Sequence, residues 1–304
     1  MTVSRPTAPA PEPVTITDDS GVHVSVVIPC YNAAHLIGRQ IEALQRQNVP
    51  FTWEIIVADN GSSDGSAAAA AAYSAPALPV TVCDASARQG VNHARNIGVQ
   101  SSSGKYILLC DADDQVNEGW LAAMSEAFTS GAKLVGGRLV RVTSEQRPVG
   151  VPDEGLRNDL NYLQWPQGAN CGFSRAVYDE LGGFDEGYAR GGDETDFFWR
   201  GQLRGHALRL VPAAAIRYTE KSAPKRRFFQ YYHYGRSHVQ LFRAFARAGM
   251  PRASNKRAVR AWIEIVRGFV AGIRSPQRRR IAISHLGQRC GRIAGSVEFR
   301  VWYP

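Results

Sequence analysis

The chain has 304 residues, of which 44% are hydrophobic and 21% are charged, as is usual for a soluble globular protein. No apolar run approaches the length of a membrane span, and the N-terminal stretch lacks the apolar core of a signal peptide, so we expect a cytoplasmic protein. The net charge of +9 hides an asymmetry, because residues 221–304 carry +17 whereas residues 1–220 carry −8. Such a basic segment suggests a polyanionic partner, either a membrane surface or a nucleic acid.

In chain order, residues 1–21 are rich in Pro, Thr and Asp and show no period, which predicts a disordered arm. Short apolar or β-branched runs then alternate with helical patterns. The predicted strands cover residues 22–28, 53–58, 80–83 and 106–110. The predicted helices between them cover residues 33–47, the alanine run 67–72 and residues 89–99. This β-α-β alternation predicts an α/β fold with a mostly parallel sheet flanked by helices.

Polar clusters follow three of these strands. They are Pro29-Cys30-Tyr31-Asn32, Asp59-Asn60-Gly61-Ser62 and Asp111-Ala112-Asp113-Asp114. One such cluster alone is typical of a turn, but parallel strands bring all three to the same edge of the sheet, where ligands bind. The last cluster contains three carboxylates, which repel one another unless a cation lies between them, and oxygen ligands suit Mg²⁺ or Mn²⁺. The alternative is an acidic turn that caps the next helix.

Two side chains near this edge suggest a nucleotide. Asp59 could accept a hydrogen bond from the imide N–H of a base, a contact that selects uracil or thymine. Arg95, on the predicted helix 89–99, could reach a base carbonyl or a phosphate. The alternative for Arg95 is an exposed helix arginine.

The second half of the sheet region begins with a helix over residues 120–128 and a strand over residues 133–136. Residues 143–167 are polar and predict a loop over the site, partly helical over residues 156–163. A short helix follows at residues 175–181. The polar stretch around Asn170, ahead of this helix, is typical of a turn.

Three acids, Asp193, Glu194 and Asp196, fall in the first turn of a helix that continues to Leu203. Carboxylates are favoured at a helix N-terminus, and Asp193 is a good capping residue. This electrostatic explanation does not account for Glu194, which closely follows a glycine pair that allows the backbone to bend close to a ligand.

The five cysteines are an odd number and form no C-x-x-C pair. Three of them lie in or beside apolar, strand-like runs. The pattern predicts buried thiols in a reducing compartment.

The sequence resembles family 2 of the nucleotide-sugar glycosyltransferases, which are inverting enzymes with the GT-A fold. The matching stretches are Val27-Ile28-Pro29-Cys30-Tyr31-Asn32, Ile56-Val57-Ala58-Asp59-Asn60-Gly61-Ser62-Ser63-Asp64, Gly90 with Ala94-Arg95-Asn96 and Gly98, Asp111-Ala112-Asp113-Asp114, and Gly183-Phe184-Asp185-Glu186 leading to Asp193-Glu194-Thr195-Asp196. They cover roughly residues 22–218. The resemblance implies a GT-A catalytic domain over residues 22–222, with a nucleotide-binding half (22–114) and an acceptor half (115–222), before a basic helical segment, 223–304.

The resemblance also implies roles for single residues. The nucleotide would be bound by Pro29, Tyr31, Asn32, Asp59, Asn60, Gly61, Arg95, Asp111 and Ala112. Asp113, together with Asp111, would hold Mn²⁺ or Mg²⁺ and so neutralise the departing diphosphate. Asn170 and Asp196 are expected on the acceptor side.

At the position of the general base, the family usually shows Glu-Asp-x-Asp where this chain has Asp193-Glu194-Thr195-Asp196. The second acid, Glu194, matches the base, and Asp193 is the alternative. The implied reaction moves a sugar from a nucleotide-diphosphate donor, most simply a UDP-sugar, to a carbohydrate or lipid-linked acceptor in polysaccharide or cell-envelope synthesis. A single displacement inverts the anomeric carbon.

The basic segment contains an amphipathic helix. Its charged stripe is Arg257, Arg260, Glu264, Arg267 and Arg274, and its apolar face is Val259, Trp262, Ile263, Val266, Phe269, Val270 and Ile273. This helix either packs on the catalytic domain or lies on anionic lipid at the inner face of the membrane, with Trp262 and Phe269 as anchors and Arg226, Arg227 and Arg278-Arg279-Arg280 as added attraction. A third reading concerns Tyr231, Tyr232 and Tyr234 beside Gln230, which would complete the acceptor site.

Two other function classes fit the sequence less well. A nucleic-acid-binding protein would leave the strand-end acids without a purpose, and they would repel a phosphate backbone, so we expect no nucleic-acid partner. A catalytically inactive sugar- or nucleotide-binding module of the same fold would not need those acids either.

Overall fold

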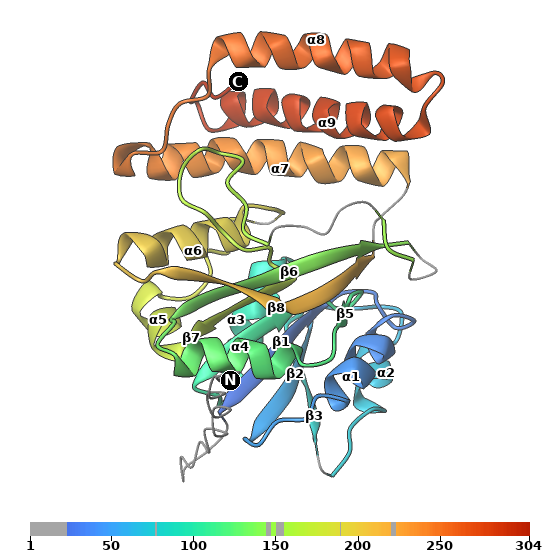
Figure 1. Ribbon diagram of the computed structural model, residues 1–304, viewed down its shortest axis with the longest axis vertical. Helices are drawn as coiled ribbons and strands as arrows, with labels where there is room; N and C mark the ends of the chain where they lie inside the picture. Colours follow the sequence, from blue (N-terminus) through green and yellow to red (C-terminus); the bar gives the residue numbers. More distant parts are fainter. Residues whose placement is uncertain (1–22, 77, 144–146, 150–154, 189, 220–222) are drawn as a thin grey trace, which may run out of the picture.

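The computed structural model describes residues 23–76, 78–143, 147–149, 155–188, 190–219 and 223–304. The predicted arm at residues 1–21 lies outside these residues. A curled sheet with helices on both faces forms one end of the molecule, and three long helices are layered over the other end (Figure 1). The helical layer is the basic segment that was predicted at residues 223–304.

The described residues form one eight-stranded sheet in the order β3-β2-β1-β4-β7-β6-β8-β5. The strands are β1 Val24–Cys30, β2 Trp53–Asp59, β3 Val80–Asp84, β4 Tyr106–Cys110, β5 Gln115–Val116, β6 Leu134–Val142, β7 Asn170–Ser174 and β8 Leu208–Thr219. The first four are parallel to one another, as the alternation predicted. Strand β7 is antiparallel to β4 and to β6, β6 is parallel to β8, and β5 is antiparallel to β8.

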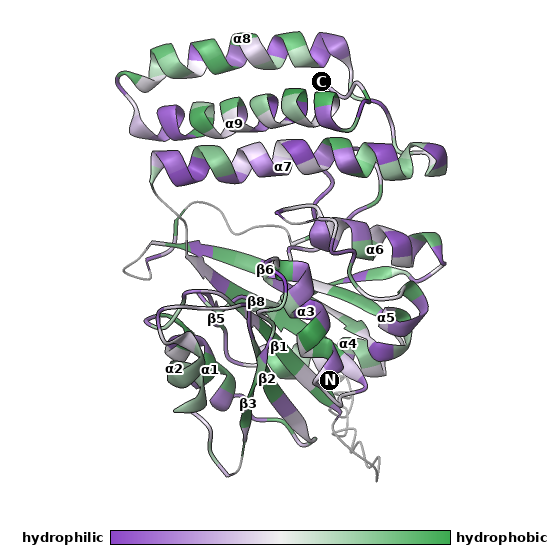
Figure 2. Ribbon diagram, turned by 180° about the vertical axis from the view of Figure 1, so that it is seen from behind, coloured by the Kyte–Doolittle hydropathy of each residue, from purple (hydrophilic) through white to green (hydrophobic). Residues whose placement is uncertain are grey.

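Two apolar cores lie on opposite faces of this sheet. The helices beside the sheet are α1 Ile37–Gln45, α2 Ser66–Ala71, α3 Val91–Gln100, α4 Trp120–Thr129, α5 Arg175–Leu181 and α6 Asp193–Leu203. Successive residues of a strand point to opposite faces, so Val26 packs in the core under α1, α2 and α4, whereas Val27 packs in the core under α3, α5 and α6. Hydrophobic residues gather in the central strands (Figure 2).

Residues 156–163 contain no helix, which corrects the prediction for this segment. Arg157 and Trp165 instead form an isolated antiparallel bridge, and Trp165 is buried with its ring edge-on to Trp199, 5.6 Å between centroids. Asn161 takes a positive φ of 52° in the turn between them. Tertiary packing of the tryptophan therefore decides the conformation here.

The three long helices are α7 Pro224–Phe245, α8 Asn255–Gly272 and α9 Pro276–Glu298, and a short 3₁₀ helix, η1 Ala246–Ala248, follows α7. Helix α9 lies between α7 and α8 (Figure 1). Its glycines Gly287, Gly291 and Gly295 recur every four residues along the side that faces α7. A Cβ atom on Gly291 would lie 1.9 Å from the carbonyl oxygen of Tyr232. Only glycine therefore allows the two backbones to approach this closely.

The part of the chain that the structure describes contains no helix both long enough and apolar enough to cross a bilayer. All five cysteines are free, as predicted, and Cys30, Cys110 and Cys171 are buried.

Candidate active site

The parallel register brings the ends of β1, β2 and β4 to one edge of the sheet, with Cys30 opposite Asp59. Asp59 is half-buried there, and its Oδ2 accepts a hydrogen bond from the Ser62 backbone N–H at 3.2 Å. Its Oδ1 is buried without a hydrogen-bond partner among the described residues. Because buried acceptors are almost always paired, this oxygen fits a donor N–H supplied by a ligand.

Hydrogen bonds join the loop that follows β1 to the loop that follows β2, beside Asp59. The Asn32 backbone N–H donates to Ser62 Oγ at 2.9 Å, and Asn32 Oδ1 accepts from the Ser63 N–H at 2.9 Å. Asn32 and Gly61 both take positive φ, 50° and 77°, which these tight turns require. Pro29 is half-buried and Tyr31 is 57% exposed, so the Tyr31 ring is accessible at this edge.

Asn60 has a different role from the predicted one. Its Nδ2 donates to the carbonyls of Ala85 and Arg88 at 2.6 and 2.8 Å, and its Oδ1 accepts from the Gly90 N–H at 2.8 Å. These bonds fix the loop that leads into α3. The Asn60 side chain is thus a positioning group, and the nucleotide contact predicted for this residue stays a prediction.

The acidic cluster follows β4, and the carboxylate oxygens of Asp111, Asp113 and Asp114 lie within 4.8 Å of one another. Asp111 and Asp113 line a cavity of about 230 Å³. Asp114 is buried, and its Oδ1 accepts from the Thr219 N–H of β8 at 3.2 Å. Ala112 packs its methyl group into the core, which leaves its main chain for a ligand. Carboxylate oxygens in such a group fit Mg²⁺ or Mn²⁺.

On the opposite wall of this cavity, α6 begins after Gly191 and Gly192, whose φ values are 86° and 78°. A Cβ on Gly191 would lie 2.7 Å from Tyr234 Cδ1, so the glycine pair lets the turn pack directly against α7. Gly192 is the N-cap residue. The prediction that Asp193 caps the helix is therefore wrong, because Asp193 is the first helical residue and its carboxylate has another partner.

That partner is Arg95 of α3, which is 3% exposed and forms an ion pair with the 5% exposed Asp193. The Arg95 guanidinium also lies over the Phe184 ring, 5.5 Å from its centroid. Burial alone would lower the pKa of Arg95, but the charges of Asp193, Glu194 and Asp111 raise it, so the group stays charged. Arg95 is not the exposed helix arginine of the alternative interpretation.

Glu194 is half-buried and lines both this cavity and an adjoining one of about 100 Å³ beneath α7. Burial, and then the neighbouring Asp193 carboxylate, raise the pKa of Glu194 to about 8, against the opposing charge of Arg95. A Cβ on Gly168 would lie 2.5 Å from Arg95 Nη2 and 3.5 Å from Glu194 Oε2, so the absence of a side chain there makes room for both groups.

The side chains of the two residues predicted on the acceptor side, Asn170 and Asp196, are buried and bond within the protein. Asn170 is fully buried: its Oδ1 accepts from Trp120 Nε1 at 2.8 Å, and its Nδ2 donates to the carbonyls of Arg138 and Ala214. Asp196 is 4% exposed, and its Oδ2 accepts from Arg200 Nε at 2.8 Å. Both side chains connect structural elements inside the protein.

The helical layer completes the site. Gln230 and Tyr234 of α7 line the larger cavity, Tyr231 and Tyr234 line the smaller one, and Gln230 Nε2 donates to the Tyr234 hydroxyl at 3.0 Å. Sequence reasoning missed other lining residues, Leu139, Gln167 and Tyr218. They belong to no motif, and only the curling of the sheet and the loop before β7 bring them to the acids.

Known proteins resemble this chain in sequence. Residues 25–182, more than half of the chain, match the family model described as Glycosyl transferase family 2. Glycosyltransferase AglE of Haloferax volcanii is 28% identical over 177 residues, 56% of this chain and 58% of that protein. The Escherichia coli protein named UDP-Glc:alpha-D-GlcNAc-diphosphoundecaprenol beta-1,3-glucosyltransferase WfgD is 31% identical over 91 residues, 30% of this chain and 35% of that protein. The chain thus matches under two thirds of either relative's length.

Solved structures share the fold. Mannosyltransferase PcManGT from Pyrobaculum calidifontis, in complex with GDP-Man and Mn²⁺, superposes with a TM-score of 0.62 and 17% identity over 92% of this chain and 87% of that chain. TarS of S. aureus, residues 1–349 in complex with UDP, gives 0.55 and 17% over 93% of each chain. At these identities the likeness concerns the fold alone, and it confirms the predicted GT-A type of sheet.

Proposed function

This chain belongs to glycosyl transferase family 2, and we propose that it transfers a sugar from a UDP-sugar to an acceptor hydroxyl with inversion of the anomeric carbon. The observation that carries the proposal is the 230 Å³ cavity that Asp111 and Asp113 share with Glu194. A group of clustered carboxylates for a cation and a separate acid with a raised pKa are the two parts that this reaction needs.

The choice of uridine rests on Asp59. Its buried Oδ1 lacks a hydrogen-bond partner among the described residues and would accept from the imide N–H of uracil. Tyr31, Asn32 and Gly61 lie in the loops around that position, and Pro29 is the next-to-last residue of β1. TarS was solved with UDP, and the name of WfgD specifies UDP-Glc, which supports uridine, whereas PcManGT was solved with GDP-Man.

The donor diphosphate would lie at the acidic cluster. Asp111 and Asp113 would hold Mn²⁺ or Mg²⁺, whose positive charge stabilises the departing diphosphate. The guanidinium of Arg95, in the wall of the same cavity, adds a permanent positive charge on the nucleotide side.

Glu194 would remove the proton of the acceptor hydroxyl as that oxygen attacks the anomeric carbon from the face opposite the leaving diphosphate. Its raised pKa makes it a stronger base than an ordinary glutamate, which suits proton transfer near neutral pH. Asp193 is already paired with Arg95 and would orient the site instead.

The acceptor would enter beneath α7, where Tyr231 and Tyr234 line the cavity next to Glu194. Sugar rings pack well on aromatic side chains with a polar tip. The names of the relatives favour a lipid-linked or polysaccharide acceptor in cell-envelope synthesis, since that of WfgD specifies a diphosphoundecaprenol-linked sugar.

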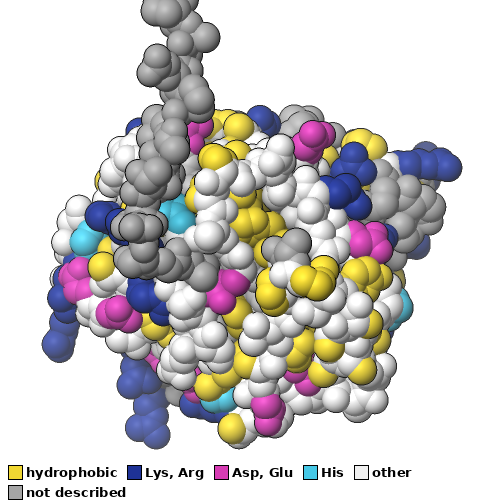
Figure 3. Space-filling model, turned by 90° about the horizontal axis from the view of Figure 1, so that it is seen from below, with side chains coloured by type: hydrophobic (Ala, Val, Ile, Leu, Met, Phe, Trp, Pro, Cys, Tyr) yellow, Lys and Arg dark blue, Asp and Glu magenta, His cyan; other side chains and the backbone are white. Residues whose placement is uncertain are grey.

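Helix α8 would dock the enzyme on the anionic inner face of the membrane. Val266 of this helix and Ile273, directly after its end, are 62% and 81% exposed. Phe269 is less exposed, at 36%, and Trp262 is partly covered. An exposed arginine follows both of the most exposed residues: Arg267 follows Val266, and Arg274 follows Ile273. On the face of the molecule farthest from these helices, acidic and basic side chains are interspersed (Figure 3). The distribution favours a lipid-facing helical end and a cytoplasmic, peripheral location.

Two alternative functions remain testable. An inactive binding module would bind UDP without transfer, but it would not need the half-buried Glu194 with its raised pKa beside the acids. A nucleic-acid-binding protein would use the basic helices and leave Asp59 and Asp113 without a role.

The proposal is tested by calorimetry of UDP binding with and without Mn²⁺. We expect the wild-type protein to bind UDP only weakly in EDTA and about tenfold or more tightly with Mn²⁺, because the cation bridges diphosphate and carboxylates. The Asp113→Asn variant should lose this dependence. Equal UDP affinity in both conditions would remove the cation from the proposal.

A further inference from the structure

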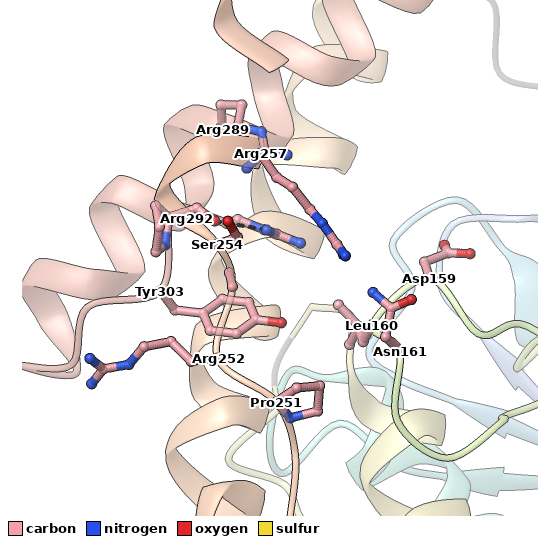
Figure 4. Close-up of a pocket in the computed structure, with 12 residues that line it drawn as sticks. Asp159, Leu160, Asn161, Pro251, Arg252, Ser254, Arg257, Arg289, Arg292 and Tyr303 are labelled. Atoms are coloured by element: carbon pink, nitrogen blue, oxygen red, sulfur yellow. Dashed lines mark hydrogen bonds between the residues drawn. The ribbon is translucent and has the colours of Figure 1, made fainter. Parts of the chain in front are cut away.

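A further cavity, lined by basic side chains, lies between the helical layer and the catalytic domain. We call this cavity of about 440 Å³ the arginine pocket, because it is lined by Arg252, Arg257, Arg289 and Arg292. Arg257, Arg289 and Arg292 come from α8 and α9, whereas Leu160 and Asn161 face them from the catalytic domain (Figure 4). Ser254, at the N-terminal end of α8, also borders it, which adds the positive end of a helix dipole.

Arg292 is the most enclosed of the four arginines, at 9% exposed. Its Nη1 donates to the Pro304 carbonyl at 2.9 Å, its Nη2 lies 3.2 Å from His238 Nδ1, and its Nε has no hydrogen-bond partner among the described residues. Burial lowers the pKa of Arg292 to about 10.

Basic side chains dominate the lining of this cavity. Asp159 also lines it, and its carboxylate is in an ion pair with Arg157. Burial, and then the charges of Arg292 and Arg157, lower the pKa of His238 well below its usual value, so its ring stays neutral. A cavity lined by four arginines fits an anion of the phosphate class, which arginine binds through paired N–H groups.

The position of the arginine pocket connects it to the proposed acceptor site. Asp159 borders both the arginine pocket and the cavity beneath α7 that contains Glu194 and Tyr231. His238, which lines the second cavity, contacts Arg292, which lines the first. A single extended acceptor can therefore reach from the base to the arginines.

We propose that the arginine pocket binds the phosphate or diphosphate group of the acceptor while the acceptor hydroxyl lies at Glu194. This inference rests on the proposed function and narrows its acceptor to a phosphorylated glycan or glycolipid. Helix α8 contributes Arg257 to the pocket and also carries the exposed apolar face, so a lipid joined to that diphosphate would leave the pocket toward the proposed membrane surface.

The test is calorimetry of the full chain with inorganic pyrophosphate in EDTA, which removes cations that would draw the probe to Asp113. Arg257→Gln and Arg289→Gln should each weaken binding about tenfold or more, because each removes a charge-assisted hydrogen bond. Arg247→Gln removes the same charge from the exposed helix η1 and should change nothing. Asp113→Asn should also bind pyrophosphate as the wild type does.

Pyrophosphate affinity that survives both pocket substitutions, or that falls equally in Arg247→Gln, overturns the inference. Because Arg257 is exposed and Arg289 is only half-buried, these variants avoid disturbing the enclosed Arg292. A second arm uses sn-glycerol 3-phosphate, and equal, arginine-dependent binding of this probe would assign the pocket to a phospholipid headgroup and overturn the acceptor assignment. UDP titrated with Mn²⁺ into the same variants reports on the proposed function separately, since that affinity should be unchanged.

Discussion

At the scale of single residues, the surroundings of two adjacent carboxyl groups separate their roles. The Asp193 carboxylate is enclosed and paired with Arg95, whereas Glu194 faces two cavities. Their order along the chain is inverted relative to the usual motif, and sequence alone left both as candidate bases. Because the ion pair with Arg95 already occupies the Asp193 carboxylate, the surroundings favour Glu194 as the base.

The same pair predicts a pH effect. A base works only when deprotonated, so the rate of transfer should fall as pH drops through the raised pKa of Glu194, about 8. Asp193→Asn removes a negative charge that raises this pKa, and the acid limb of the kcat/KM profile should move to lower pH. Asp179→Asn, a matched change on the exposed surface of α5, should leave the limb in place. An unmoved limb in Asp193→Asn would argue against Glu194 as the titrating base.

Other polar residues show what the sequence could not tell. Asp59, Arg95 and Asp113 were predicted at the site, and the structure brings them to one edge of the sheet or to its cavity. Asn60 and Asn170 are polar residues in or near the same turns, yet their side chains bond inward to backbone carbonyls. Composition and spacing do not reveal whether a turn asparagine faces a ligand or the interior, because both satisfy its hydrogen-bonding groups.

At the scale of elements, the sequence pattern located the strands of the parallel half and the start of β6, but not β5, β7 or β8. Strands β7 and β8 went unpredicted, because β7 contains a glycine and β8 contains Pro212 and three alanines, which are poor strand formers. Pro212 lies where the pairing of β8 with β6 is interrupted, so the ladder loses little there. Such residues form strands because neighbouring strands and burial impose the conformation.

The helical layer depends on close backbone contact, and Gly291→Ala tests this. The added methyl group would lie 1.9 Å from the Tyr232 carbonyl oxygen, so α7 and α9 must separate. We expect a loss of about 1–3 kcal/mol in the free energy of unfolding, measured by denaturant titration. Gly268→Ala meets only the Ala282 side chain closely, at 3.0 Å, and gains helix propensity, so it should be nearly neutral. Equal stability of both variants would contradict the packing argument.

At the scale of the whole molecule, charge is divided between the two ends. Residues 1–220 carry −8 and include the cluster of Asp111, Asp113 and Asp114, whereas residues 221–304 carry +17. Helix α7 contacts both ends: its Tyr234 lines the cavity that contains Asp113 and Glu194, and its backbone packs on α9. This arrangement would hold the acceptor cavity next to any surface on which the helices dock.

Vesicle co-sedimentation across a salt series tests the docking. Each basic residue near an anionic bilayer contributes about 1 kcal/mol, and the Debye length falls from about 10 Å at 0.1 M salt to about 3 Å at 1 M. We expect binding to anionic vesicles at low salt, weaker binding at high salt and little binding to neutral vesicles. Val266→Asn should reduce the part that resists salt, because Val266 is 62% exposed on α8. No binding to anionic vesicles at low salt would refute membrane docking.

The most direct measurement is acceptor-dependent UDP release by Glu194→Gln, using a panel of UDP-sugars with Mn²⁺ and diphosphate-linked lipid acceptors. The substitution keeps the shape of the side chain and removes the base. Our account predicts an unchanged UDP affinity and a rate reduced about a hundredfold or more. A Glu194→Gln enzyme that transfers at nearly the wild-type rate, beside an inactive Asp193→Asn enzyme, would contradict it.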